Sequence, residues 1–124
     1  AISLGILPHT ISSDIYCRNR INGPVYSLAN VMSKFLAIGM TLPQVIDCVT
    51  ANAADGLNLK SKGRLEPGLD ADLTLFTLRR QPTVLVDAEN DSLQAEKLLV
   101  PLAAIRAGKG YVTEQGSAER DFDL

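Results

Sequence analysis

The chain has 124 residues, of which 46% are hydrophobic and 21% are charged. This length suits one small domain or part of a larger one, and the composition excludes both a disordered chain and one that crosses a bilayer. The net charge of −2 argues against non-specific binding to nucleic acid or to an anionic membrane, so we expect neither as a partner.

Two cysteines, Cys17 and Cys48, are too few for a disulfide framework, and their spacing does not suggest a zinc site. We therefore expect reduced thiols and a cytoplasmic protein. The opening residues lack the basic region and the long apolar run of a signal peptide, and the first residue is Ala. The beginning of the chain is thus expected to be truncated or processed.

The first elements in chain order are a short strand and a polar loop. Residues 10–13 end a β-branched, apolar run and are predicted as the end of a strand. Residues 14–26 contain Asn, Gly and Pro and are predicted as a loop. Functional sites are often built on such loops at strand ends.

Helices are predicted next. Apolar residues recur at helical spacing between Ser27, an N-cap, and Gly39, a left-handed stop. Thr41 and Gln44 form a capping-box pattern at the start of a second helix. Thr50 is predicted to cap a short third helix that stops at Gly56.

From residue 60 the periodicity changes from 3.6 to 2, with two short extended pieces around Gly63, Pro67 and Gly68. Further strands are predicted near residues 73–75, 83–86 and 98–106, and the last of these pairs with residues 111–112 across the Ala-Gly-Lys-Gly turn. The tail from residue 113 is polar and is expected to be mobile or loosely packed. Helices followed by strands indicate two segregated layers.

Several motifs resemble those of one enzyme family. The passage GRLEPGLDADLTLF resembles the G-x-L-x-P-G-x-x-A-D-L-x-L-F signature of the amidohydrolase superfamily. TANAADGLNL is similar to the helix that precedes this signature, although Ala53 replaces a common Pro and Asn58 a usual Gly. LVPLAAIRAGKGYV resembles the closing hairpin, and with NGPVYSLANVMSKFLAIGM the combination is most similar to the dihydroorotase-like deacetylase branch.

The resemblance implies an α/β parent enzyme built on a metal-dependent (β/α)8 barrel with a small flanking β-sandwich. Residues 1–59 would be the end of the barrel, with its last strand and helices, and residues 60–124 the C-terminal segment of the sandwich. The implied activity is hydrolysis of a cyclic amide or an N-acyl bond in a small-molecule substrate by metal-activated water. The implied cofactor is a divalent metal, Zn²⁺ in the first place, with one or two ions in the full-length enzyme and none in this fragment, which would be inactive.

Asp14 is the candidate catalytic residue. The resemblance places it at the end of the last barrel strand, where it would bind the metal and shuttle a proton to the leaving nitrogen. The alternative is that Asp14 only caps the loop, as Asx turns do. Arg18 and Arg20 are candidates to clamp a substrate carboxylate, or they are simply solvated, and Asn22 and Gly23 could bind polar substrate atoms.

Other reactive residues are assigned structural roles. One imidazole, that of His9, does not make a metal site, so a packed or hydrogen-bonded structural histidine is expected. Cys17 has no assignable base and is expected to be a small buried apolar residue. Asp70 and Asp72 are expected to hold backbone geometry at a turn and a strand start.

A second class of function stays open: a free-standing structural or interaction module without chemistry of its own. For the parent enzyme we expect a homo-oligomer. The isolated chain would also self-associate if the helical stripe of Leu28, Val31, Met32 and Phe35 is left uncovered.

Overall fold

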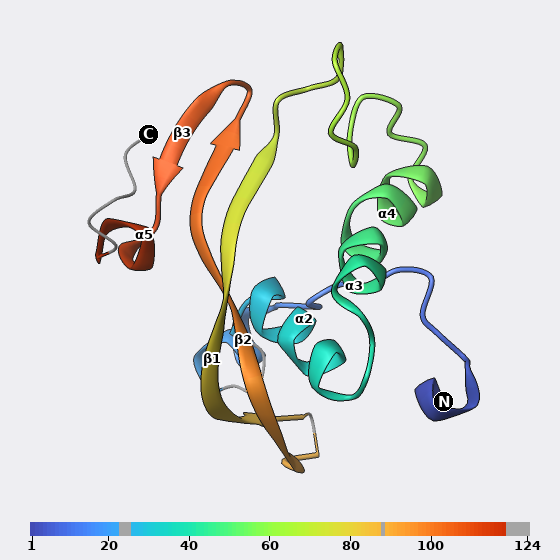
Figure 1. The fold of residues 1–124 in the computed structure, drawn as a ribbon, viewed down its shortest axis with the longest axis vertical. Helices are drawn as coiled ribbons and strands as arrows, with labels where there is room; N and C mark the ends of the chain where they lie inside the picture. The colour runs from blue at the N-terminus through green and yellow to red at the C-terminus, as the bar shows by residue number, and fades with distance from the viewer. Residues whose placement is uncertain (23–25, 88, 119–124) are drawn as a thin grey trace.

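The structure is a computed structural model that describes residues 1–22, 26–87 and 89–118. Helices come first and a three-stranded antiparallel sheet follows, in the order β1–β2–β3 (Figure 1). The helices α2, α3 and α4 run along one flank of the long β1–β2 hairpin, and both α2 and α5 pack against β2. The elements are η1 (Ile2–Leu4), α1 (Cys17–Asn22), α2 (Leu28–Ala37), α3 (Leu42–Val49), α4 (Ala51–Gly56), β1 (Leu73–Val86), β2 (Ser92–Arg106), β3 (Lys109–Val112) and α5 (Glu114–Ala118).

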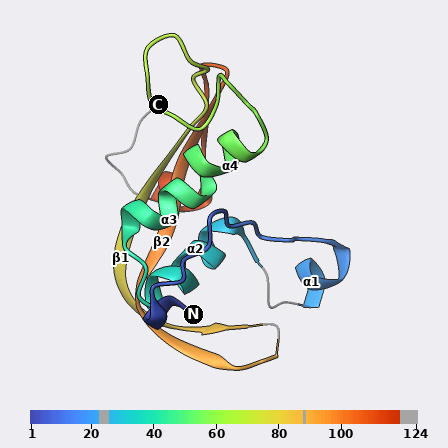
Figure 2. The ribbon, with the colours of Figure 1, turned by 90° about the vertical axis from the view of Figure 1, so that its right-hand side faces the viewer.

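The strands β1 and β2 are longer than the sequence predicts and form one continuous hairpin. Two register shifts interrupt the ladder: Leu102 is an extra residue in β2, and Gln81 and Pro82 face only Glu96. Such bulges bend a hairpin and give Pro82 a place where no ladder hydrogen bond is lost. The hairpin curves accordingly (Figure 2).

The predicted hairpin between β2 and β3 is confirmed. Arg106 pairs with Lys109, so the turn consists of Ala107 and Gly108 alone. Both residues have positive φ values, 49° and 77°, as a two-residue turn with the twist of a type I′ hairpin requires. By contrast, the two short extended pieces predicted between residues 60 and 72 are absent from the described chain, which forms turns and bends there.

The predicted ends of α2 and the start of α3 are confirmed. Ser27 Oγ accepts a hydrogen bond from the Asn30 N–H at 3.1 Å. At the other end of α2, Gly39 has a φ of 107°, and the Gly39 and Met40 amides donate to the Leu36 and Phe35 carbonyls. This pair of bonds is a Schellman motif. Thr41 and Gln44 form the reciprocal capping box.

The ends of α4 differ from the prediction. Thr50 occupies the N-cap position, but its hydroxyl donates to the Ile46 carbonyl at 2.7 Å and does not cap the helix. At the other end the left-handed residue is Asn58, with a φ of 55°, and not Gly56. Asn tolerates this conformation because its short polar side chain can form hydrogen bonds with the nearby backbone. The Leu59 amide donates to the Ala54 carbonyl and the Asn58 amide to the Asp55 carbonyl, so α4 ends in a second Schellman motif.

The hydrophobic core joins the helices to the sheet. Met32 of the predicted stripe is buried in this core, and Val31 and Phe35 pack against it. The helix α2 contacts β2 and α3, so most of the apolar stripe that we expected to be exposed is covered within the chain. One buried polar side chain, Ser33, lies at this junction. The buried core cluster consists of Ile11, Met32, Met40, Val45, Cys48 and Leu99.

Two further predictions are wrong. Residues 10–13 form no strand, because within the described chain they lie beside helices and the Ile11 amide donates to the Cys48 carbonyl at the end of α3. A strand needs a neighbouring strand to pair with, and the sheet of this chain lies elsewhere. The tail is not loose throughout: residues 114–118 form α5, which packs on β2.

Candidate functional site

Asp14 ends the irregular segment that enters α1. Its side chain is exposed and its backbone is left-handed, with a φ of 48°. Few residue types other than Gly adopt this conformation, and Asp is among those that do so most readily. This left-handed residue lies between the segment from residue 8 to 13 and α1, which begins at Cys17.

Three hydrogen bonds attach the preceding segment to the helices. The Ile11 amide donates to the Cys48 carbonyl at 3.2 Å, and the Cys48 thiol donates to the Pro8 carbonyl at 3.2 Å. The side-chain amide of Asn52, in α4, donates to the His9 carbonyl at 2.8 Å. The position of Asp14 therefore depends on α3 and α4 as well as on its own neighbours in sequence.

The candidate substrate residues follow Asp14 in α1. Arg18 lies in this helix with an exposed side chain. Arg20 and Asn22 belong to the same helix, but their side chains, like the whole of Gly23, lie outside the described residues. Figure 2 shows α1 set apart from the other helices. Asp14 and Arg18 are both exposed.

The histidine and the cysteines take different places. His9 is exposed and uses its backbone carbonyl for the contact with Asn52. Both cysteines are free thiols, as expected, but Cys17 is exposed in the first turn of α1, so its predicted burial is wrong. Cys48 is buried, and burial, with a smaller effect of nearby Asp47, raises the pKa of its thiol.

Asp70 and Asp72 hold the loop before β1, as predicted. Lys62 Nζ lies 2.9 Å from Asp70 Oδ2 and also pairs with Asp72. Asp72 Oδ1 accepts the Ala107 amide at 2.9 Å, so this carboxylate links the loop to the β2–β3 turn. The hydrogen bond from Lys62, followed by that from the Ala107 amide, lowers the pKa of Asp72.

The next feature is the capacity of the described residues to bind a metal ion. No cluster of three or more His, Cys, Asp or Glu side chains there could hold a metal ion. Asp14 can offer carboxylate oxygen to a hard or borderline divalent cation, but one ligand does not make a centre. It can also accept and return a proton at the surface.

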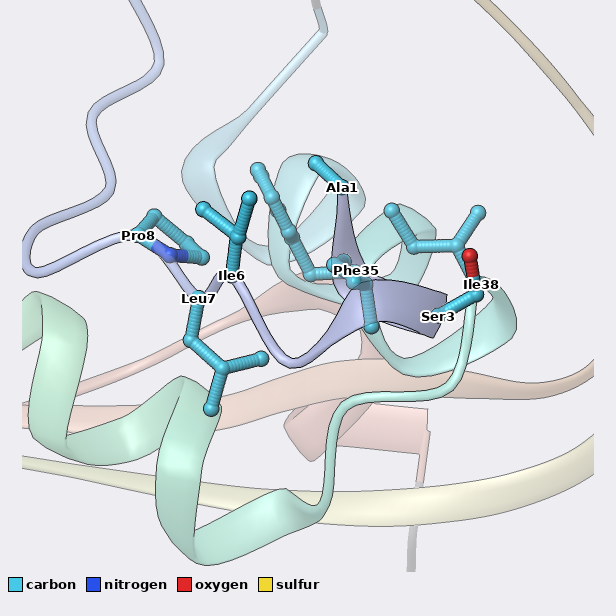
Figure 3. A pocket seen from close by; sticks show the side chains of 8 residues that line it. Ala1, Ser3, Ile6, Leu7, Pro8, Phe35 and Ile38 are labelled. Atoms are coloured by element: carbon cyan, nitrogen blue, oxygen red, sulfur yellow. The ribbon is translucent and has the colours of Figure 1, made fainter.

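An open groove, which Asp14 does not line, lies beside the first residues of the chain (Figure 3). Its volume is about 560 Å³, and its walls come from the segment around η1 and from α2. The lining is almost wholly apolar, which offers no group for acid–base chemistry. The lining residues are Ala1, Ile2, Ser3, Ile6, Leu7, Pro8, Phe35 and Ile38.

Asn52 is the residue that the sequence analysis missed. It lies in TANAADGLNL, and its helix was predicted, but its partner His9 is 43 residues away. A polar side chain near the start of a short helix, on a motif already singled out, was the available signal. Nothing in the local pattern indicates which distant backbone group it meets.

Comparison with known proteins adds a family match. Residues 10–108 match the amidohydrolase family. The chain is 40% identical over 111 residues to a protein named deacetylase from Enterococcus faecalis, and the match covers 90% of this chain and 30% of that protein.

Two solved structures share the fold. A crystal structure of an adenine deaminase superposes with a TM-score of 0.88 at 39% identity, and a crystal structure of a dihydroorotase with a TM-score of 0.82 at 32% identity. Each match covers 90% of this chain and 30% of the other. The chain thus spans about a third of the length of these relatives. In the described residues, no helix has the length and apolar character that a membrane span needs.

Proposed function

This chain belongs to the amidohydrolase family, and on that basis we propose that it is the C-terminal portion of a metal-dependent hydrolase that cleaves a C–N bond outside peptides. The substrate class is a cyclic amide or an N-acyl amine. The names of the similar proteins, a deacetylase and a dihydroorotase among them, support this class. Family membership also weighs against the alternative of a free-standing interaction module.

The proposal divides the chain into two parts. Residues 1–59 would complete the catalytic barrel, and residues 60–124 would belong to the flanking β-sandwich. The order of elements supports this division, because α1 to α4 precede residue 60, whereas the whole sheet and the short helix α5 follow it. The two parts share one core, in which Leu99 of β2 contacts residues of the helical half.

Asp14 is the proposed catalytic residue. The matched region begins four residues before it, and the carboxylate is exposed at the end of an anchored segment. An amine leaves poorly unless it is protonated, so a carboxylate that takes a proton from the attacking water and passes it to the nitrogen lowers the barrier. Arg18, Arg20, Asn22 and Gly23 are the proposed substrate contacts, because they follow Asp14 directly.

The proposed cofactor is a divalent metal, Zn²⁺ in the first place. When bound, it would make water a better nucleophile at neutral pH. Asp14 would contribute one oxygen ligand, and the other ligands would come from residues outside this chain.

The test is an assay of the full-length protein that carries this sequence. Cyclic amides and N-acetyl amines are offered in parallel, and release of the ring-opened acid or the free amine is measured. We expect turnover of at least one class, loss on treatment with a chelator and recovery on addition of Zn²⁺. Turnover that survives removal of all metal would contradict metal dependence, and the absence of C–N hydrolysis across both classes would contradict the proposal as a whole.

A further inference from the structure

We infer that Asn52 is a positioning residue for Asp14: its side-chain amide fixes the segment that carries the carboxylate. The inference rests on the proposed function only for the role of Asp14. The anchor itself rests on the geometry of α3, α4 and residues 8–14.

Within this chain, the segment before Asp14 makes its hydrogen bonds to the ends of helices. In the described structure the residues from 8 to 13 pair with no strand. Their contacts with the end of α3 and the start of α4 are the Ile11 amide on the Cys48 carbonyl, the Cys48 thiol on the Pro8 carbonyl and the Asn52 amide on the His9 carbonyl. The bond from Asn52 is the shortest of the three at 2.8 Å, against 3.2 Å for each of the others.

Asn52 supplies what this contact needs. The His9 carbonyl is an acceptor, so its partner must be a donor, and the Asn amide nitrogen has two N–H groups. Asp has almost the same shape but, when ionised, only acceptors. Replacement by Asp would place a carboxylate against a carbonyl oxygen, whereas replacement by Ala would only remove the bond.

The helix that carries Asn52 is itself well fixed. Arg64 binds Asp55 of α4 through two parallel bonds of 3.0 and 2.7 Å. Gly63 packs so closely that an added Cβ would lie 2.6 Å from the Thr50 carbonyl oxygen and 2.7 Å from the Ala54 Cβ. Contacts with the loop around Gly63 and Arg64 therefore fix α4. A fixed α4 gives the Asn52 side chain a defined position from which to bind the His9 carbonyl.

The consequence concerns catalysis more than substrate binding. Asp14 acts only if its carboxylate stands at the reacting atoms, and displacements of about 1 Å can cost on the order of a hundredfold in rate. A loosened segment leaves the substrate contacts in α1 chemically intact. The expected effect of breaking the anchor is a lower kcat with a KM changed much less.

The experiment compares Asn52→Ala, Asn52→Asp and Asn58→Gly in the full-length protein. Asn58→Gly is the matched control, because Asn58 belongs to the end of the same helix and Gly suits its φ of 55°. Hydrogen–deuterium exchange of peptides covering residues 8–16 is read together with kcat and KM. For both Asn52 variants we expect exchange there to be about tenfold faster and kcat to be about tenfold lower or more, with Asp at least as severe as Ala. The control should match the wild type in all three.

Three outcomes test whether Asn52 positions Asp14, and they can be distinguished from a failure of the proposed function. If exchange at residues 8–16 is unchanged in a folded Asn52 variant, the anchor is wrong whatever the activity. If exchange rises and kcat stays at the wild-type value, Asn52 holds the segment without positioning a catalytic group, which also overturns the inference. An Asp14→Asn protein with wild-type kcat would instead refute the proposed function, while the exchange data would still report on the anchor.

Discussion

Ser33 shows how one residue joins two parts of this molecule. Its side chain is fully buried in α2, donates to the Ala29 carbonyl at 2.8 Å and accepts the Leu99 amide of β2 at 3.0 Å. The hydroxyl thus satisfies a buried backbone donor in the sheet that would otherwise lack a partner. A helix residue thereby fixes where β2 lies against α2.

Replacement of Ser33 by Ala should destabilise the protein by about 1–3 kcal/mol, because a buried amide that loses its acceptor pays its full desolvation cost. Urea unfolding measures the difference. Ser92→Ala is the control, since Ser92 is exposed, and it should stay within about 0.5 kcal/mol of the wild type. Equal stability of the two variants would mean that the Leu99 amide finds another acceptor.

The sequence predicts single residues well only where their partners are near in the chain. Ser27, Gly39 and the Thr41–Gln44 pair act within four residues of themselves, and their predicted roles are confirmed. Ser33 and Asn52 meet partners 66 and 43 residues away, which no local pattern reveals. The catalytic role of Asp14 stays a prediction, because it depends on a metal and on further ligands that its sequence neighbours do not supply.

At the scale of elements, the bulge in β2 provides the docking site of α5. The Thr113 amide donates to the Leu102 carbonyl at 2.8 Å. The Thr113 hydroxyl lies 2.8 Å from the Pro101 carbonyl oxygen and 2.9 Å from that of Leu102, and it accepts the Gly116 amide. A Cβ on Gly116 would lie 2.0 Å from the Leu102 oxygen. The helix can pack here only because this position carries no side chain.

Gly116→Ala should therefore displace α5 from the sheet and lower the free energy of unfolding of the protein by about 1–3 kcal/mol, the usual cost of overpacking. Gly56→Ala is the matched control, because an added Cβ there meets nothing within 4 Å and Ala favours a helix. Thermal unfolding of both variants measures the contrast. A lower Tm for Gly116→Ala with an unchanged or higher Tm for Gly56→Ala is expected, and the reverse order would contradict the packing of α5.

The Lys62–Asp70–Asp72 cluster gives the loop a pH dependence of known sign. The folded state lowers the pKa values of Asp70 and Asp72, through Ser61 and Lys62 for the first and Lys62 and the Ala107 amide for the second. Their contribution to stability is thus complete above the ordinary carboxyl pKa of about 3.9 and is lost as the pH falls through the lowered values.

An Asp72→Asn variant isolates this effect. Its Tm should lie below that of the wild type by a constant amount from pH 7 down to about pH 5, and the gap should close as the wild-type carboxylate is protonated at lower pH. Since these groups are exposed, the gap should be small. A gap that stays the same down to pH 2 would show that the Asp72 charge contributes nothing.

Elements were predictable where pairing is local. The β2–β3 hairpin was predicted from the Ala-Gly-Lys-Gly segment and is confirmed, with a turn of two residues in place of four. The long β1–β2 hairpin was missed in part, because its bulges and residues such as Arg79 and Pro82 hide the alternation of a strand. The strand at residues 10–13 was predicted from β-branched composition, but composition cannot supply a neighbouring strand.

At the scale of the whole molecule, one core holds together the two parts that the proposal assigns to different domains. Ile11 of the N-terminal segment, Val45 and Cys48 of α3 and Leu99 of β2 belong to the same buried cluster. A change in the sheet can therefore reach the segment that carries Asp14. The family match covers both parts, from residue 10 to residue 108.

The central claim is tested most directly by kcat of the full-length protein with Asp14→Asn, measured on the substrate that the wild type hydrolyses. Asn keeps the size of the side chain and removes the charge and the proton-accepting oxygen. Loss of a general acid–base group costs about a hundredfold to ten-thousandfold, so we expect a fall of at least a hundredfold in a variant with wild-type Tm. A folded Asp14→Asn protein that keeps its kcat within a factor of about three would contradict the account.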